Sequence, residues 1–420
     1  MSALRRRFQD CAAAAAGPGR RRQKGVDDYA PTRYEAGMDT VGDIEIFLVT
    51  FPGAEALLCA EAREKGFFDP TPVKGGVTVR GGWPEVWRAN LELRGASRVL
   101  ARVAAFRAFH LAQLDKRARR VAWSEFLRPD VPVRVEAACK GSRIYHAGAA
   151  TQRIEKAIRE ELGAPISAEA DVVIKARIDD DLCTISIDTS GESLHKRNHK
   201  EAVHKAPMRE TLASLFLRQC GYDGTEPVVD PMCGSGTFVI EAAEIAAGLK
   251  PGRSRRFDFE QLAGFDEAAW SRMRGAGDGA EGGDEAGGDG DIEPAVRFHG
   301  SDRDAGAIAM SRTNAALAGV AGVTEFRQHA VTDLVAPSGP PGLVIVNPPY
   351  GNRIGDKKQL YSLYAALGQT LTSCFVGWRV GLVTSEATLA RATGLPFGEP
   401  AVSVSHGGMR VSLYLAEALT

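Results

Sequence analysis

The sequence lacks the features that mark several common classes of protein. It contains no run of about 20 apolar residues, so no helix is expected to span a membrane. Its seven cysteines are scattered and include no C-x-x-C pair, which argues against a disulfide framework or a zinc site. Neither sign of charge dominates, because 52 Lys and Arg residues stand against 53 Asp and Glu. We therefore expect a cytoplasmic protein with structural thiols, no membrane contact and no bound metal.

Two stretches have a composition that does not support a packed core. Residues 1–38 carry an alanine run behind three arginines, too short and too weakly apolar for a signal segment, and we interpret them as a disordered basic tail. Residues 275–293 are almost wholly Gly, Ala, Asp and Glu and are expected to form a disordered acidic insertion.

Charge is distributed unevenly along the chain. Residues 94–159 hold fifteen Lys and Arg against five Asp and Glu, whereas residues 275–293 hold seven acids and no base. A basic surface of that density suits a polyanionic partner such as nucleic acid. The alternative interpretation is a solvated basic face without a partner.

Residues 39–191 show the pattern of two small α+β units, at 39–100 and 101–191. Short β-branched or aromatic stretches predict strands, and helical spacing of apolar residues predicts helices. The expected strands are 43–50, 77–80, 131–138, 171–178 and 182–189, and the expected helices are 53–65, 83–93 and 149–162.

Residues 192–420 alternate regularly between strands and helices, which predicts an α/β, Rossmann-like domain built on a mostly parallel sheet. The expected strands are 227–230, 296–301, 324–329, 343–347 and 379–384, and the expected helices are 207–218, 237–247, 303–318 and 358–375. The adjacent stretches 401–405 and 409–416 should add an antiparallel edge.

A glycine loop follows the first strand of this domain, in the string D-P-M-C-G-S-G-T from Asp230 to Thr237. Gly234 and Gly236 would let the backbone approach a ligand, and the helix start beyond them favours an anionic group such as the methionine carboxylate of S-adenosylmethionine. The string matches neither a P-loop nor a dinucleotide fingerprint. The candidate cofactor-binding residues are Asp230, Cys233, Gly234, Gly236 and Thr237.

Two further acids extend this candidate site. Asp302 ends the next strand, where a carboxylate can accept hydrogen bonds from a ribose diol. Asp333, after the following strand, is suited to accept from the adenine amine. Either acid could instead be a helix cap, as Asp302 would be for the helix that follows it.

The most informative string is Asn347-Pro348-Pro349-Tyr350, at the end of an apolar strand. The prolines lack amide hydrogens and restrict the backbone, which holds the carbonyl acceptors in fixed directions. The Asn347 oxygen and the Pro348 carbonyl can accept both protons of a planar amine and orient it for methylation, and Tyr350 can stack on an extruded base. The alternative is a purely structural role, in which the motif is a rigid turn that ends a core strand.

Taken together, these residues resemble the THUMP-domain class I RNA methyltransferases, and within them the bacterial 23S ribosomal RNA guanine-N2 (RlmL-like) type. The resemblance rests on the strings at 194–197, 206–213, 230–237 and 347–351. It implies a ferredoxin-like unit and an RNA-binding THUMP domain before about residue 191, with Lys140, Arg143 and Arg153 as candidate phosphate contacts. It also implies transfer of a methyl group from S-adenosylmethionine to the N2 amine of a guanine.

The resemblance leaves alternatives open. Some relatives continue into a second methyltransferase domain, whereas this sequence shows the motifs of one, so we expect a single modification. After the proline turn, Asn352-Arg353 replaces an acid that is common in the family. The same amine chemistry serves guanine N2 of transfer RNA, adenine N6 of DNA and glutamine amides of proteins. An RNA-binding protein with a vestigial cofactor site is a further alternative; it predicts damage to the motif residues, and none is present.

Overall fold

The computed structural model describes residues 44–198, 208–275, 297–350, 357–406 and 408–420, which form two compact units. Of the described residues, the first unit comprises 44–50, 59–194 and 256–275, and the second comprises 51–58, 195–198, 208–255 and those from 297 onward. The predicted tail at 1–38 and, apart from Gly275, the predicted insertion at 275–293 lie outside the described residues. Within the described ranges, no helix is long and apolar enough to cross a membrane.

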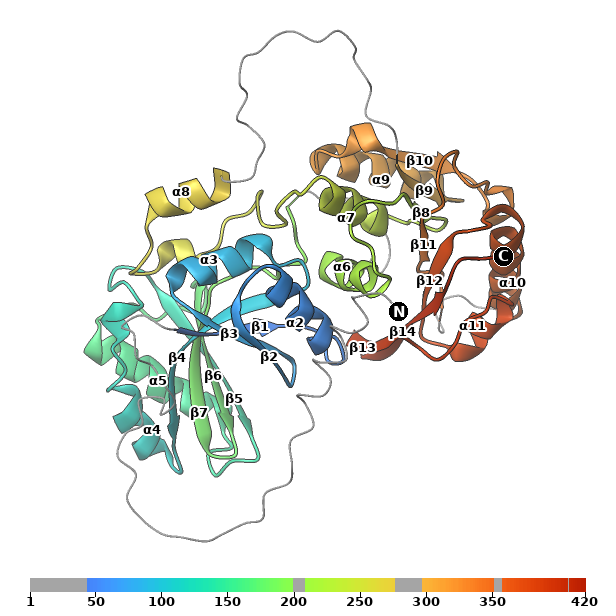
Figure 1. Cartoon of the computed structure of the whole chain (residues 1–420). Helices are drawn as coiled ribbons and strands as arrows, with labels where there is room; N and C mark the ends of the chain where they lie inside the picture. Colours follow the sequence, from blue (N-terminus) through green and yellow to red (C-terminus); the bar gives the residue numbers. More distant parts are fainter. Residues whose placement is uncertain (1–43, 199–207, 276–296, 351–356, 407) are drawn as a thin grey trace, which may run out of the picture. The chain divides into compact units, whose positions relative to one another are not determined.

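One seven-stranded sheet is the framework of the first unit (Figure 1). Its strand order is β2-β3-β1-β4-β7-β6-β5, and every pair is antiparallel except β5 with β6. The strands are β1 Ile44–Val49, β2 Phe68–Val73, β3 Gly76–Gly81, β4 Arg98–Arg107, β5 Val133–Lys140, β6 Val172–Asp179 and β7 Leu182–Asp188. The helices are α2 Glu55–Glu64, which crosses the division between the units, α3 Trp83–Glu92, α4 Leu111–Ala118, α5 Ala147–Glu161 and α8 Glu267–Gly275.

Strand β4 joins the two predicted α+β units into that one sheet, because it pairs with β1 along one edge and with β7 along the other. The sequence pattern predicted neither β4 nor β2 nor α4. In β4, Arg98 and Arg102 interrupt the apolar pattern, but each is neutralised by an acid on a neighbouring strand: Arg98 pairs with Asp188 and Arg102 with Glu45. Cross-strand ion pairs of this kind make a charged strand compatible with a sheet interior.

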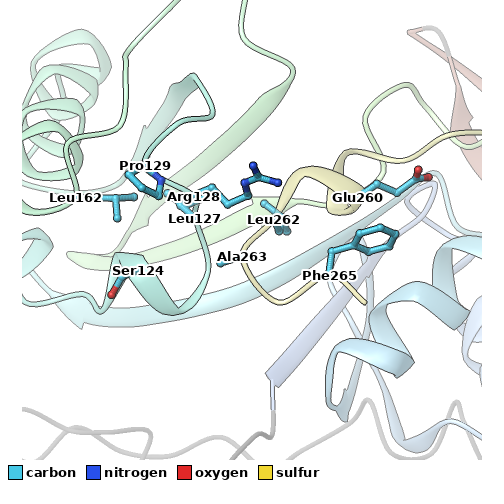
Figure 2. A pocket seen from close by; sticks show the side chains of 9 residues that line it. All are labelled: Ser124, Leu127, Arg128, Pro129, Leu162, Glu260, Leu262, Ala263 and Phe265. Carbon is cyan, nitrogen blue, oxygen red and sulfur yellow. The ribbon is translucent and has the colours of Figure 1, made fainter. Parts of the chain in front are cut away.

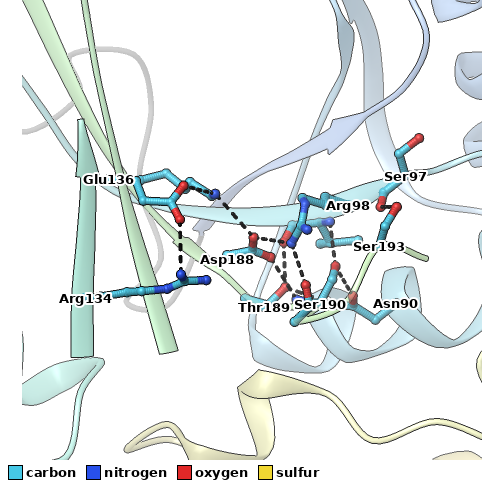
Figure 3. Close-up of polar contacts among 12 residues, drawn as sticks. Asn90, Ser97, Arg98, Arg134, Glu136, Asp188, Thr189, Ser190 and Ser193 are labelled. Carbon is cyan, nitrogen blue, oxygen red and sulfur yellow. Dashed lines mark hydrogen bonds and ion pairs between the residues drawn. The ribbon is translucent and has the colours of Figure 1, made fainter. Parts of the chain in front are cut away.

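A polar network fixes the chain where it leaves β7 (Figure 3). Asp188 is almost fully buried and accepts a hydrogen bond from Arg98. The Ser190 hydroxyl donates to Asn90 Oδ1 at 2.6 Å, and Asn90 Nδ2 donates to Thr189 Oγ1 at 3.0 Å. The network thereby joins α3, β4 and the end of β7 with buried polar groups whose partners are protein atoms.

The second unit is an α/β fold on a second seven-stranded sheet, with strand order β10-β9-β8-β11-β12-β14-β13 (Figure 1). The first five strands in this order are parallel, and β14 and β13 add an antiparallel edge. The strands are β8 Val228–Asp230, β9 Phe298–Asp302, β10 Thr324–Gln328, β11 Leu343–Val346, β12 Arg379–Thr384, β13 Val402–His406 and β14 Met409–Ala416. The helices are α6 Glu210–Gln219, α7 Thr237–Ala246, α9 Ala305–Leu317, α10 Lys357–Cys374 and α11 Ala387–Ala392. The predicted fold class is confirmed.

The burial of these strands explains why their sequences are continuous runs of apolar residues. All four residues of β11 are buried, as expected for a parallel strand covered on both faces. On one face, α10 packs Leu360, Leu367 and Leu371 against a core that includes residues of β11 and β12.

Candidate active site

The carboxyl ends of three neighbouring strands bring together residues that lie far apart in the sequence. Asp230 is the last residue of β8, Asp302 is the last residue of β9, and Asn347 directly follows β11. Strand β8 lies between β9 and β11, and all three are parallel. The strand order therefore reverses beside β8, and such a switch point is where ligands bind in open α/β sheets.

The glycine loop after β8 contains two glycines in left-handed conformations, Gly234 at φ +55° and Gly236 at φ +83°. A β-carbon on Gly234 would meet no atom within 4 Å, whereas one on Gly236 would come within 3.2 Å of Ile240 and Phe326. The Gly234 amide donates to the Asp302 carboxylate at 3.1 Å. Gly234 thus leaves open space beside the loop, and Gly236 allows close packing at the start of α7.

Cys233 and Thr237 make their contacts with other parts of the protein. The Cys233 amide donates to the Ser301 carbonyl at 2.9 Å, and its sulfur lies 3.8 Å from the Ser311 hydroxyl. Burial raises the pKa of the Cys233 thiol, which keeps it protonated. The hydroxyl of Thr237, the first residue of α7, donates to the Met208 carbonyl at 3.5 Å. Both side chains therefore stabilise the shape of the loop.

Asp302 does not cap the helix that follows it, contrary to the alternative considered from the sequence. Asp304 caps α9 by accepting the Gly306 amide at 2.8 Å, and Asp302 accepts the Asp304 amide at 3.0 Å. Asp333 ends a short 3-10 helix after β10 and is exposed. Asp302 is therefore held by the loop and by the start of α9, beside the opening at Gly234.

The carboxyl group of Asp230 is buried, and it has no ion-pair partner among the residues that the structure describes. Its oxygen accepts the Met232 amide at 3.0 Å, yet burial, with a smaller contribution from Asp302, raises the pKa of Asp230 to about 8. A positively charged ligand beside Asp230 would favour the ionised form of this carboxyl group and lower its pKa. Together with the open space at Gly234, this preference fits S-adenosylmethionine, which carries an ammonium and a sulfonium group.

The proline turn presents one polar atom that lacks a partner. Asn347 Oδ1 is buried and accepts no hydrogen bond from any residue in the described part of the chain. A buried acceptor of this kind is costly unless a ligand completes it. Pro348 is buried, and Tyr350 packs partly against the core beneath α10. The turn therefore holds an amide oxygen ready for a donor at the same sheet edge as Asp230 and Asp302.

Two residues behind this turn, Tyr364 and Thr384, could not be identified from the sequence pattern. Tyr364 on α10 is fully buried, and its hydroxyl donates to the Pro349 carbonyl at 3.3 Å. The same hydroxyl lies 3.3 Å from Thr384 Oγ1 at the end of β12. In the sequence, Tyr364 shares the helical spacing of Leu360, Leu367 and Leu371, so it reads as an ordinary core residue.

The three candidate phosphate contacts are exposed on the first unit. Lys140 ends β5, Arg143 lies in the next loop, and Arg153 is on α5. The Arg143 guanidinium lies 5.0 Å from the centre of the Phe109 ring. Near Arg143 in the chain, Tyr145 is 85% exposed, an aromatic surface that the sequence analysis did not single out.

A separate hollow lies in the first unit (Figure 2). It has a volume of about 430 Å³ and contains none of the predicted catalytic or cofactor-binding residues. Its lining residues are Ser124, Leu127, Arg128, Pro129, Leu162, Glu260, Leu262, Ala263 and Phe265. Among the described residues, no group of three or more His, Cys, Asp or Glu is arranged to hold a metal ion.

The fold and the strand-edge site together define a class I methyltransferase domain preceded by a second, sheet-based unit. Family models match three consecutive parts of the chain: the RlmL ferredoxin-like domain at 45–100, the THUMP domain at 109–188 and the RMKL-like methyltransferase domain at 197–405. The chain belongs to this family of THUMP-containing, RMKL-like methyltransferases. The predicted family is confirmed, and S-adenosylmethionine is confirmed as the cofactor of such a domain.

Individual relatives agree with that assignment. The ribosomal RNA large subunit methyltransferase K/L of Syntrophotalea carbinolica is 34% identical over 84% of this chain, but the chain spans only 50% of that protein. A putative RNA methyltransferase of Synechocystis is 29% identical over 87% of this chain and 95% of its own length. A putative methyltransferase solved in complex with SAH is 26% identical, with a TM-score of 0.80 over 91% of this chain and 100% of its own.

Proposed function

We propose that this chain is an S-adenosylmethionine-dependent RNA methyltransferase that methylates the exocyclic N2 amine of a guanine in 23S ribosomal RNA, in the cytoplasm. The observation that carries the proposal is the unpartnered Asn347 Oδ1, held at the same strand edge as Asp230 and Asp302. The THUMP match and the K/L relative support an RNA substrate.

The residues of the proline turn address the difficulty of this reaction. An exocyclic amine is a poor nucleophile because its lone pair is delocalised into the base. We expect Asn347 Oδ1 and the Pro348 carbonyl to accept hydrogen bonds from the two N–H groups of the amine. These bonds direct the nitrogen lone pair at the methyl group. Bound S-adenosylmethionine supplies that methyl group on a positively charged sulfur, so positioning provides most of the acceleration. The nitrogen bonds the methyl carbon, the sulfur keeps the electron pair, and one amine proton leaves to water.

The loop residues would hold the cofactor. Both Asp302 oxygens already accept backbone amides, and because each has a second lone pair, the carboxylate can still accept ribose hydroxyls. The start of α7 near Thr237 would favour the methionine carboxylate, and Asp333, in the short 3-10 helix after β10, would accept the adenine amine.

The test is a methyl-transfer assay with 23S ribosomal RNA and transfer RNA as separate substrates, followed by mass spectrometry of the nucleosides. N2-methylguanine in ribosomal RNA is the expected product. Asn347→Ala should lower kcat by about 100-fold while binding of RNA and S-adenosylhomocysteine persists, because only the positioning of the amine is lost.

Other outcomes would replace the proposal. N2-methylguanine found only in transfer RNA would reassign the substrate. RNA binding without methylation of either RNA would favour a vestigial cofactor site. Near-normal turnover by Asn347→Ala would refute the amine contact.

A further inference from the structure

The face of α10 that packs on the sheet contains one polar group, the Tyr364 hydroxyl. Leu360, Tyr364, Leu367 and Leu371 belong to one core cluster, and Tyr364 is 0% exposed. Leucine or phenylalanine would supply the apolar contact equally well. Most buried hydroxyls have hydrogen-bond partners, and the partners of Tyr364 indicate what its hydroxyl does.

Those partners assign the direction of the hydrogen bonds. The Tyr364 oxygen lies 3.3 Å from the Pro349 carbonyl oxygen and 3.3 Å from Thr384 Oγ1. A carbonyl can only accept, so the Tyr364 hydroxyl donates to Pro349, and Thr384 Oγ1 is a second acceptor for the same phenolic proton. Thr384 Oγ1 in turn accepts the Glu386 amide at 3.3 Å. The Tyr364 hydroxyl thus links the end of β12 to the turn that follows β11.

The turn depends on such an outside donor for a physical reason. Pro348 and Pro349 have no amide hydrogen, so this part of the turn cannot be held by its own backbone donors. Burial raises the pKa of the Tyr364 hydroxyl, which therefore remains a donor throughout the physiological range. With the Pro349 carbonyl engaged by Tyr364, the Asn347 amide oxygen is left without a protein partner in the described structure.

We propose that Tyr364 is a positioning residue for methyl transfer: by donating to the Pro349 carbonyl it fixes the turn in the one orientation in which Asn347 Oδ1 and the Pro348 carbonyl accept the substrate amine. This inference rests on the proposed function. It assigns to Tyr364 of α10 control over the geometry of a turn to which Tyr364 does not belong.

Tyr364→Phe tests the role because it removes only the hydroxyl. We expect kcat for RNA methylation to fall about fivefold to tenfold, the effect of one missing hydrogen bond on the transition state. KM for RNA and calorimetric affinity for S-adenosylhomocysteine should stay within about twofold. Hydrogen exchange in a peptide covering 343–350 should accelerate. Thr384→Val removes only the competing acceptor and leaves the bond to Pro349 in place, so it should change these parameters by less than about twofold.

The matched control is Tyr361→Phe, which removes a hydroxyl from the same helix at a side chain that is 41% exposed. It should leave turnover and exchange unchanged. Wild-type kcat in Tyr364→Phe would overturn the proposal, and so would a parallel loss of kcat and cofactor affinity, which marks a general scaffold defect. If the wild-type protein methylates no RNA, the proposed function is wrong, and the positioning role of Tyr364 is then judged from hydrogen exchange. Unchanged exchange at 343–350 in Tyr364→Phe would overturn that role.

Discussion

The carboxyl group of Asp258 lies in an unfavourable environment within the first unit. Burial raises the pKa of Asp258 to about 7, and repulsion from Asp188 and Asp171 adds to this shift, while Arg98 and Arg134 oppose it. Figure 3 shows how Asp188 is already engaged by Arg98. The fold therefore accommodates a carboxylate that would be more stable as a neutral group.

Asp258→Asn should stabilise the protein at alkaline pH. The folded-state pKa lies above the unfolded value of about 4, so between these values the folded state binds more protons and the unfolding free energy falls as pH rises. The penalty is complete above about pH 7 and absent near pH 4. Calorimetry should show a higher Tm at pH 8, by about 2–4 °C for each kcal/mol gained, and a smaller gain at pH 5. Glu169→Gln, at an exposed acid, is the control; equal gains at both pH values would contradict the assignment.

Among individual residues, those that belong to a recognisable sequence motif could be predicted as site residues. Asp230, Asp302 and Asn347 could be predicted as strand-end groups because parallel strands bring their carboxyl ends to one edge. Tyr364 could not, because an aromatic residue at helical spacing has the same pattern whether or not its hydroxyl is used.

Among the elements, the segment 256–275 belongs to the first unit although it follows α7 of the second. It contributes Phe257, Phe259 and Trp270 to an aromatic cluster in which Phe259 stacks on Trp87 with ring centres 6.0 Å apart. The Phe259 amide also donates to the Thr189 carbonyl at 3.2 Å. Spacing along the sequence could not predict this membership, because the contacts that create it are made with residues more than sixty positions away.

Phe259→Ala should destabilise the first unit strongly. Its ring is 0% exposed and lies at the centre of the cluster, so truncation leaves a cavity and costs about 3–5 kcal/mol. Phe68→Ala, at a phenylalanine that is 70% exposed, removes the same atoms from the surface. Differential scanning calorimetry should show a Tm drop only for Phe259→Ala, and similar drops for both variants would disprove the role of the cluster.

For the whole molecule, a net charge of -1 conceals a basic stretch in the first unit. Nucleic-acid binding depends on local rather than net charge, because each neutralised phosphate releases counterions. The prediction of a polyanionic partner therefore does not conflict with the nearly neutral total.

RNA affinity should consequently fall steeply with salt. Replacing Lys140, Arg143 and Arg153 with glutamine should reduce the slope of log affinity against log salt by about one unit for each phosphate that is no longer neutralised. Arg410→Gln, at an exposed cation of the second unit, should leave the slope unchanged. Filter binding across a salt series measures both variants, and an unaltered slope in the triple variant would rule these residues out.

Strand β4 also limits how this chain can change during evolution. The ferredoxin-like match ends at residue 100 and the THUMP match begins at residue 109, so the seam between the two modules falls on β4. Recombination at that seam would split a strand that is hydrogen-bonded along both edges. Separating the two modules at that seam would therefore leave an unpaired, hydrogen-bonding strand edge on each of them.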